Sequence, residues 1–276
     1  MQKKQIKTIF FMKKFTFLLT LCLCVLFCNA QIKRNQKGQK VVERIEISYE
    51  ENAERFNIII FDYDEFLNLK GIKFKTRNDI YYWKKENNTI IRNKYKSTEY
   101  RYKIDNGLIT YYKSYETGTD GSILTHRDEI IYNQENRIQQ VKEKVGNDEE
   151  YCNILWNANN NKYREDRYMY DEENNTSFLI CKYVSTFYSE LVNDTNIEFG
   201  YIYLYGEDND IPLMTEWFGE HSYNLVETCL GKYFDYEFDN EYGGMDFDTN
   251  DRGNLITVKI FSDKKIDTIY KIYYLE

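Results

Sequence analysis

The sequence has 276 residues, a formal net charge of −8, and 27 tyrosines against a single proline. Residues 1–30 hold five of the 37 Lys and Arg and no acidic residue, so residues 31–276 carry 32 basic against 45 acidic side chains, a net charge of −13. A surface this acidic repels nucleic-acid phosphates and anionic lipid, which excludes both as expected partners. The excess of tyrosine over proline favours strands throughout the chain.

Residues 1–30 have the three parts of a secretory signal peptide. Lysines precede an apolar run at 15–27, and Cys28-Asn29-Ala30 places small residues where cleavage occurs. An uncleaved anchor is the alternative, but the run is shorter than the roughly 20 apolar residues that span a bilayer. We therefore predict that the chain is exported and that residues 31–276 remain. Three cysteines remain in that part, Cys152, Cys181 and Cys229, and at least two are expected to be buried and unpaired.

Alternating apolar and polar side chains predict β-strands from residue 41 onward. At 99–104, Tyr100, Tyr102 and Ile104 share one face and charged residues share the other, as in a sheet with one side in water. Residues 31–40, before the first strand, are expected to be a disordered leader. The main strands are expected at 41–49, 55–63, 69–75, 80–85, 89–94, 99–103, 122–132, 138–145, 150–156, 163–170, 177–191, 197–205, 232–238, 255–262 and 265–275.

One phrase recurs between these strands: an aromatic residue, a short polar turn, and then aliphatic residues. It is clearest from Tyr132 to Ile138, it returns from Tyr63 to Leu69, and a looser version runs from Trp156 to Tyr163. Asn, Asp and Gly in such turns tolerate a positive φ, and Asn-Gly at 106–107 is a hairpin signal. We interpret the phrase as a hairpin turn that returns each strand to the same sheet.

The pattern breaks at residues 206–231, a non-repetitive insertion that contains the only proline. Pro212 stands where a proline suits the first turn of a helix, so one short helical segment is expected over 211–218. No Gly- or Ser-rich linker divides residues 41–276, which predicts one domain. The fold class is therefore all-β: a large antiparallel up-and-down meander of about 15 strands, strongly curled or barrel-like, with one short helical insertion.

Several stretches resemble a known family. These are the repeated tyrosine-centred turns, the Ile-Pro-Leu-Met at 211–214 with the residues to Leu225, and the closing Asp-Arg-Gly-Asn-Leu-Ile-Thr at 251–257. They resemble uncharacterised secreted proteins and lipoproteins of Gram-negative gut bacteria that have a porin-like fold, and the turns are also similar to YD repeats. The resemblance implies a porin-like β fold and an envelope location. The family has no assigned activity, so the resemblance implies no site residues, and this chain lacks a lipidation cysteine.

Two groups of residues are candidate sites. Asp246, Asp248 and Asn250 begin like a calcium loop, but the glycine and the final glutamate of such loops are missing, so a hairpin turn is the preferred interpretation and no cofactor is expected. The insertion also carries a candidate binding surface of three aromatic residues and a histidine: Trp217, Phe218, His221 and Tyr223. For each of them, packing against the sheet is the alternative interpretation.

No catalytic signature is present. The sequence has two histidines 95 residues apart, His126 and His221, and no glycine-rich nucleophile turn accompanies either. We therefore expect a non-enzymatic scaffold of the periplasm or cell surface that binds an envelope protein or a glycan, without membrane insertion of the mature chain. Two alternatives stay open: an outer-membrane barrel or pore component, and a carboxylate-dependent glycoside hydrolase.

Overall fold

The computed structural model describes residues 31–49, 57–76, 79–92, 98–118, 121–145, 148–171, 175–199, 214–234, 241–262 and 265–276. The predicted signal peptide, residues 1–30, and the proline at 212 lie outside the described residues. Within the described part of the chain, no helix is long and apolar enough to cross a membrane.

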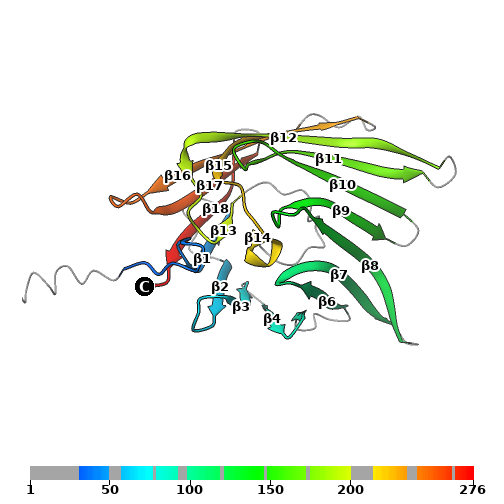
Figure 1. Ribbon diagram of the computed structural model, residues 1–276, viewed down its shortest axis with the longest axis horizontal. Helices are drawn as coiled ribbons and strands as arrows, with labels where there is room; N and C mark the ends of the chain where they lie inside the picture. The colour runs from blue at the N-terminus through cyan, green and yellow to red at the C-terminus, as the bar shows by residue number, and fades with distance from the viewer. Residues whose placement is uncertain are drawn as a thin grey trace, which may run out of the picture.

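Sixteen strands form one closed antiparallel barrel, which confirms the expected all-β fold (Figure 1). Strands β1 to β12 pair with their neighbours in chain order, β12 pairs with β15, and β18 closes the ring against β1. The strands of the wall are β1 (Val42–Ser48), β2 (Asn57–Tyr63), β3 (Leu69–Lys75), β4 (Ile80–Glu86), β5 (Thr89–Arg92), β6 (Thr98–Asp105), β7 (Leu108–Gly118), β8 (Gly121–Tyr132), β9 (Ile138–Val145), β10 (Asp148–Trp156), β11 (Lys162–Asp171), β12 (Thr176–Val192), β15 (Asn224–Tyr233), β16 (Glu241–Thr249), β17 (Leu255–Ser262) and β18 (Lys265–Tyr274).

The recurring phrase is a turn organised by one side chain. In the turn between β8 and β9, Asn133 Oδ1 accepts the backbone N–H groups of Glu135 and Arg137, and Asn136 has a φ of 60°. The same pair of acceptor bonds is made by Asp64, Asn157 and Asn250 in their own turns. Asx side chains that hold their own backbone in this way explain why one short polar sequence can return the chain repeatedly.

The aromatic residue that precedes such a turn is tied to the neighbouring strand. Tyr63 Oη donates to the carbonyl of Val42 at 2.7 Å, and Tyr132 Oη donates to that of Ile109 at 2.7 Å. Trp156 Nε1 makes the equivalent bond to Ile138 at 2.8 Å. A buried polar tip needs a partner, and the partner here is the adjacent strand, so each aromatic residue fixes the end of a hairpin to the barrel wall.

Apolar side chains of the wall point mainly into the barrel, and the exposed charged side chains point out; β11 is an exception, because it carries charged side chains on its inner face. On β1, Ile45 and Ile47 lie in the core, whereas Arg44 and Glu46 form an ion pair on the other face. One apolar cluster joins most of the strands inside the ring. Exposed charged side chains on the strands include Glu43, Lys70, Lys75, Lys84, Glu86, Arg101, Lys103, Glu129, Lys142, Lys144, Lys232, Asp246 and Lys271.

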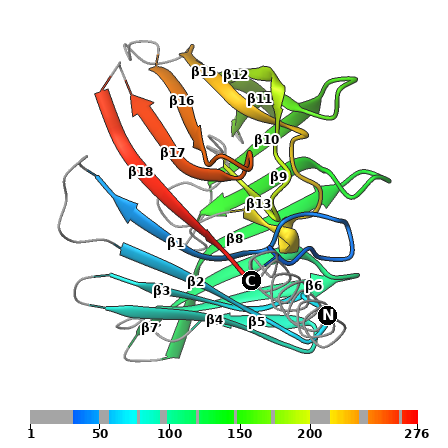
Figure 2. The same cartoon turned by 90° about the vertical axis from the view of Figure 1, so that its left-hand side faces the viewer.

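The chain leaves the wall after β12 and enters the ring before it returns at β15. The segment between β12 and β15, residues 193–223, is called the insertion from here on, and it begins before the range expected from the sequence. It contains the two-stranded sheet of β13 (Ile197–Glu198) and β14 (Met214–Thr215), followed by the short 3-10 helix η1 (Glu216–Phe218). In both orientations β13 and η1 lie inside the ring of strands (Figures 1 and 2). The barrel is therefore filled in part by its own chain.

Three sequence-based boundaries need correction. Residues 31–40 are not a disordered leader, because Lys33 donates its N–H to Leu275 and Lys40 donates its N–H to Asp194. Residues 224–231 do not belong to the insertion but form most of β15, since their backbone pairs with β12 and β16. The expected start of a strand at residue 232 is too late, because β15 already begins at Asn224 and ends at Tyr233; residues 235–238 of that expected strand lie outside the described residues.

Candidate functional site

The insertion reaches the barrel wall first through η1. Trp217 Nε1 donates to the carbonyl of Leu69 at 3.2 Å, and Glu216 Oε1 accepts the N–H of the same residue at 2.6 Å. Trp217 is 1% and Phe218 is 3% exposed, so both lie in the apolar core. Burial raises the pKa of the Glu216 carboxyl, although the hydrogen bond from Leu69 opposes this effect.

A glycine allows the closest approach between insertion and wall. Gly219 has a φ of 92°, and a Cβ at this position would lie 2.1 Å from the carbonyl oxygen of Asn136. The next residue, Glu220, donates its N–H to that same oxygen at 2.9 Å. A side chain at 219 would therefore have to displace backbone as well as adopt an unfavourable conformation.

Beyond Gly219 the insertion continues along the turns of the barrel. His221 is half-buried, and Tyr223 is 54% exposed and donates its N–H to Asn160 at 3.1 Å. Of the four predicted binding residues, only Tyr223 presents a largely exposed ring. Trp217 and Phe218 can meet a ligand only if the insertion moves, and ligand binding at any of the four stays a prediction.

A cluster of buried charges forms a further contact between the insertion and the wall. Lys162 Nζ of β11 lies 3.3 Å from Glu165 Oε1 and 3.9 Å from Glu198 Oε1 of β13, and each side chain is at most 6% exposed. Ser222 Oγ donates to Glu198 Oε1 at 2.9 Å. Glu165 Oε2 and Glu198 Oε2 are buried and have no hydrogen-bond partner among the described residues.

Two carboxylates share one ammonium in this cluster. Burial raises the pKa of Glu165, and the charge of Glu198 adds to that effect while Lys162 opposes it. For Lys162, burial lowers the pKa, but the two glutamates outweigh it and the net shift is upward. Lys162 therefore stays charged. If the cluster binds one more proton, that proton goes to a carboxylate.

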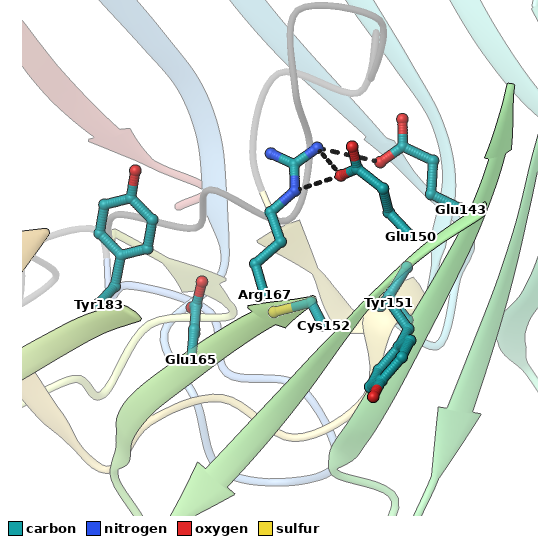
Figure 3. A pocket seen from close by; sticks show the side chains of 8 residues that line it. Glu143, Glu150, Tyr151, Cys152, Glu165, Arg167 and Tyr183 are labelled. Atoms are coloured by element: carbon teal, nitrogen blue, oxygen red, sulfur yellow. Dashed lines mark hydrogen bonds and ion pairs between the residues drawn. The ribbon is translucent and has the colours of Figure 1, made fainter. Parts of the chain in front are cut away.

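A small pocket lies in the wall beside this cluster, on the inner face of β9, β10 and β11 (Figure 3). Arg167 donates from Nε to Glu150 Oε2 at 2.6 Å, and its Nη2 lies 3.6 Å from Glu143 Oε2. Cys152 and Glu165 line the same pocket, whose free volume of about 20 Å³ holds about one water. The guanidinium is thus occupied by glutamates of its own chain.

The cysteines are structural in character. Cys152, Cys181 and Cys229 are all buried and in the thiol form, as expected from the sequence for at least two of them. Burial raises the pKa of the Cys152 thiol far above neutrality and that of Cys229 to about 11. A thiol attacks as the thiolate, so these side chains are poor nucleophiles at neutral pH.

The calcium-like residues belong to a strand and a turn. Asp246 and Asp248 lie exposed on β16, and only Asn250 enters the turn, which begins later than the sequence suggested. Asn250 Oδ1 accepts the N–H groups of Arg252 and Asn254, both at 3.0 Å. Turn formation therefore accounts for Asn250. Among the described residues, no group of three or more His, Cys, Asp or Glu side chains is arranged to hold a metal ion.

Sequence reasoning missed the buried charges. Residues 162–167 read Lys-Tyr-Arg-Glu-Asp-Arg, a run that is typical of a solvated strand. The signal that could have found them is the register: Cys152 pairs with Arg167, and Ile154 pairs with Glu165. Since paired residues share a face, apolar residues on β10 place these charged side chains of β11 inside the barrel.

No family model and no curated protein matches the sequence. Among solved structures, the chain is similar to a porin-like protein from Bacteroides uniformis ATCC 8492, with a TM-score of 0.58 and 13% identity over 84% of this chain and 96% of that one. It is also similar to a porin-like protein from Bacteroides vulgatus ATCC 8482, with a TM-score of 0.58 and 9% identity over 85% of this chain and 98% of that one. The likeness is one of fold, and it agrees with the porin-like shape that the sequence resemblance implies.

Proposed function

We propose that this chain is a non-enzymatic binding protein of the bacterial envelope, built as a barrel whose outer wall faces water and whose interior is filled by its own insertion. The observation that carries the proposal is the direction of the side chains. In membrane-spanning barrels the outer face carries an apolar band and the interior is polar. Here the apolar cluster lies inside, and exposed Lys, Glu and Arg side chains recur along the outer face.

The insertion supports binding rather than transport. η1 is hydrogen-bonded to β3 through Leu69, and Glu220 is hydrogen-bonded to the turn between β8 and β9 through Asn136. The segment therefore contacts separate parts of the ring and occupies the interior between them (Figure 2). A solute could pass along the axis only after these bonds had broken.

The inner pocket supports a non-enzymatic role. Its arginine is paired with Glu150, its thiol is protonated at neutral pH, and its free volume of about 20 Å³ is far below the roughly 300–1,000 Å³ of small-molecule sites. A glycoside hydrolase needs two carboxyl groups with room for a sugar between them. The glutamates here contact arginine or lysine of the same chain instead.

One observation favours the alternative of an outer-membrane barrel. Val184, Leu230 and Tyr242 are exposed neighbours across β12, β15 and β16, and they form an apolar row on the outer wall. The porin-like proteins of similar fold point the same way. In β12 and β15, however, the row lies only two residues from the paired lysines Lys182 and Lys232, and a charge in the middle of a lipid-facing band costs about 2–4 kcal/mol.

Cell fractionation tests the proposal. The full chain is expressed in a Gram-negative host, and the mature protein is followed through osmotic release, membrane sedimentation and detergent extraction. We expect recovery in the detergent-free soluble fraction. Recovery only from detergent-extracted outer membrane would overturn the proposal in favour of the membrane barrel. A variant with Lys182→Leu and Lys232→Leu is the matched control, since extending the apolar row should shift it toward the membrane fraction.

A further inference from the structure

The outer face of β10 and β11 carries a cluster of tyrosines. The register pairs Tyr151 with Tyr168, and their rings stack with centroids 4.9 Å apart and planes 10° apart. Tyr170 follows two residues later and therefore lies on the same face. All three rings are half-buried. Tyr151 also lines the inner pocket, but its ring points away from Arg167 and Glu165 (Figure 3).

Planar polar side chains form the next row of the same face. Gln140 Nε2 donates to Asn153 Oδ1 at 2.7 Å, and Asn153 pairs in register with Asp166. Arg164 donates from Nε to Asp166 Oδ1 at 2.7 Å, and Asp166 is only 4% exposed although it lies on the outer wall. Amide and carboxylate groups held by such bonds keep a fixed orientation next to the tyrosine rings.

A groove of about 350 Å³ runs over this face and is lined by Gln140, Lys142, Glu149, Glu150, Tyr151 and Tyr170. That volume falls within the roughly 300–1,000 Å³ typical of small-ligand sites. It contrasts with the inner pocket, which holds about one water. The groove therefore has a much larger free volume than the inner pocket, and it opens on the outside of the barrel.

The charges of the groove nearly cancel. Glu150 is bonded to Arg167 on the inner face, so its charge is already compensated. Lys142 and Glu149 remain, one positive and one negative. A ligand with a strong net charge would gain little from such a lining, and it would have to displace polar groups that water now solvates. The lining instead suits an uncharged ligand that is rich in hydroxyl groups.

We propose that this groove binds a neutral oligosaccharide, with a sugar ring against Tyr151 or Tyr170 and its hydroxyl groups on Gln140, Lys142 and Glu149. A tyrosine ring offers an apolar face to the C–H side of a sugar, while amide, ammonium and carboxylate groups exchange hydrogen bonds with hydroxyls. The inference rests on the proposed function, because the outer wall must face water for a glycan to reach the groove.

Affinity electrophoresis tests the inference. The purified protein is run in native gels that contain starch, xylan, mannan or galactan, each an uncharged polysaccharide. We expect at least one of them to retard the protein, and Tyr151→Ala or Tyr170→Ala to weaken that retardation by about ten-fold or more, as for a central aromatic contact. Tyr82→Ala removes an exposed ring of β4 outside the groove and should leave the retardation unchanged.

The outcomes separate this inference from the proposed function. A detergent-free soluble protein that none of the four polysaccharides retards would overturn the glycan site and leave the water-facing barrel in place. Retardation that survives unchanged in both folded variants, Tyr151→Ala and Tyr170→Ala, would place the glycan elsewhere and would also overturn the inference. Thermal unfolding of each variant shows that it is folded, and two separate variants guard against the failure of one to fold.

Discussion

Two of the contacts between the insertion and the barrel wall have opposite chemistry. At one, Trp217 and Phe218 are buried in the apolar core, and the indole N–H has a backbone partner. At the other, Lys162, Glu165 and Glu198 are buried together, with two carboxylates for one ammonium. Burial of aromatic surface stabilises the fold, whereas burial of charges costs desolvation that the ion pairs repay only in part. We infer that the first contact supplies stability and the second fixes the position of the insertion.

The largest expected effect is the loss of the aromatic contact. Trp217→Ala removes a side chain that is 1% exposed and leaves a cavity, which should lower the free energy of unfolding by about 3–5 kcal/mol. Denaturant unfolding followed by tyrosine and tryptophan fluorescence measures the change. Tyr223→Ala is the control on the same insertion, because its ring is 54% exposed and its loss should cost less than about 0.5 kcal/mol. Equal effects of the two variants would contradict the assignment.

Removal of the buried cation should have the next largest effect. Lys162→Met keeps an unbranched side chain of similar length but leaves Glu165 and Glu198 buried without an ammonium. We expect a loss of about 3 kcal/mol at neutral pH, as for other buried ion pairs that lose one partner. The same unfolding measurement applies.

A second variant shows whether the charge is responsible. Adding Glu165→Gln and Glu198→Gln to Lys162→Met removes the uncompensated carboxylates and should recover most of the lost free energy. If the triple variant is as unstable as Lys162→Met alone, the lysine acts through packing, and the charged contact does not differ from the aromatic contact in the way we infer.

Much of the barrel wall could be predicted because it depends on local sequence. The expected ranges for β3 and β9 are the observed ones, at Leu69–Lys75 and Ile138–Val145. Both are bounded by turns that an Asx side chain holds. Closure of the ring could not be predicted in the same way. It depends on the pairing of β1 with β18, which are far apart in the chain and carry no turn between them.

The aromatic contact and the charged contact of the insertion also differ in how far the sequence predicts them. The aromatic contact left a signal, since Trp217 and Phe218 stood out from the strand pattern and packing was one of the two interpretations. The charged contact left a signal only in the register of β10 and β11, and Glu198 meets Lys162 only after the chain has turned into the barrel. Charged residues are usually solvated, so a pattern of polarity assigns such a cluster to the surface.

The smallest of these effects is a dependence of stability on pH that arises at the charged contact alone. Burial raises the pKa of Glu165, so the folded state binds this proton more tightly than the unfolded state does. Stability should therefore fall as the pH rises from the ordinary glutamate pKa of about 4.3 through the raised value, by about 1.4 kcal/mol for each unit of difference. Glu165→Gln should remove this part of the pH dependence. At a pH above the raised pKa of Glu165, the variant should be more stable than the native protein.

An exposed carboxyl gives the matched control for this dependence. Glu43→Gln on β1 changes a glutamate that is exposed to water, so it makes the same chemical change away from the buried cluster. Unfolding midpoints measured from pH 4 to pH 8 on the three proteins compare the profiles directly. A Glu165→Gln profile that coincides with that of the native protein would mean that the buried carboxylate titrates as it does in the unfolded chain. Burial of Glu165 would then contribute no pH dependence to stability, and the insertion would be positioned mainly by its other contacts with the wall, among them those of Trp217, Phe218 and Gly219.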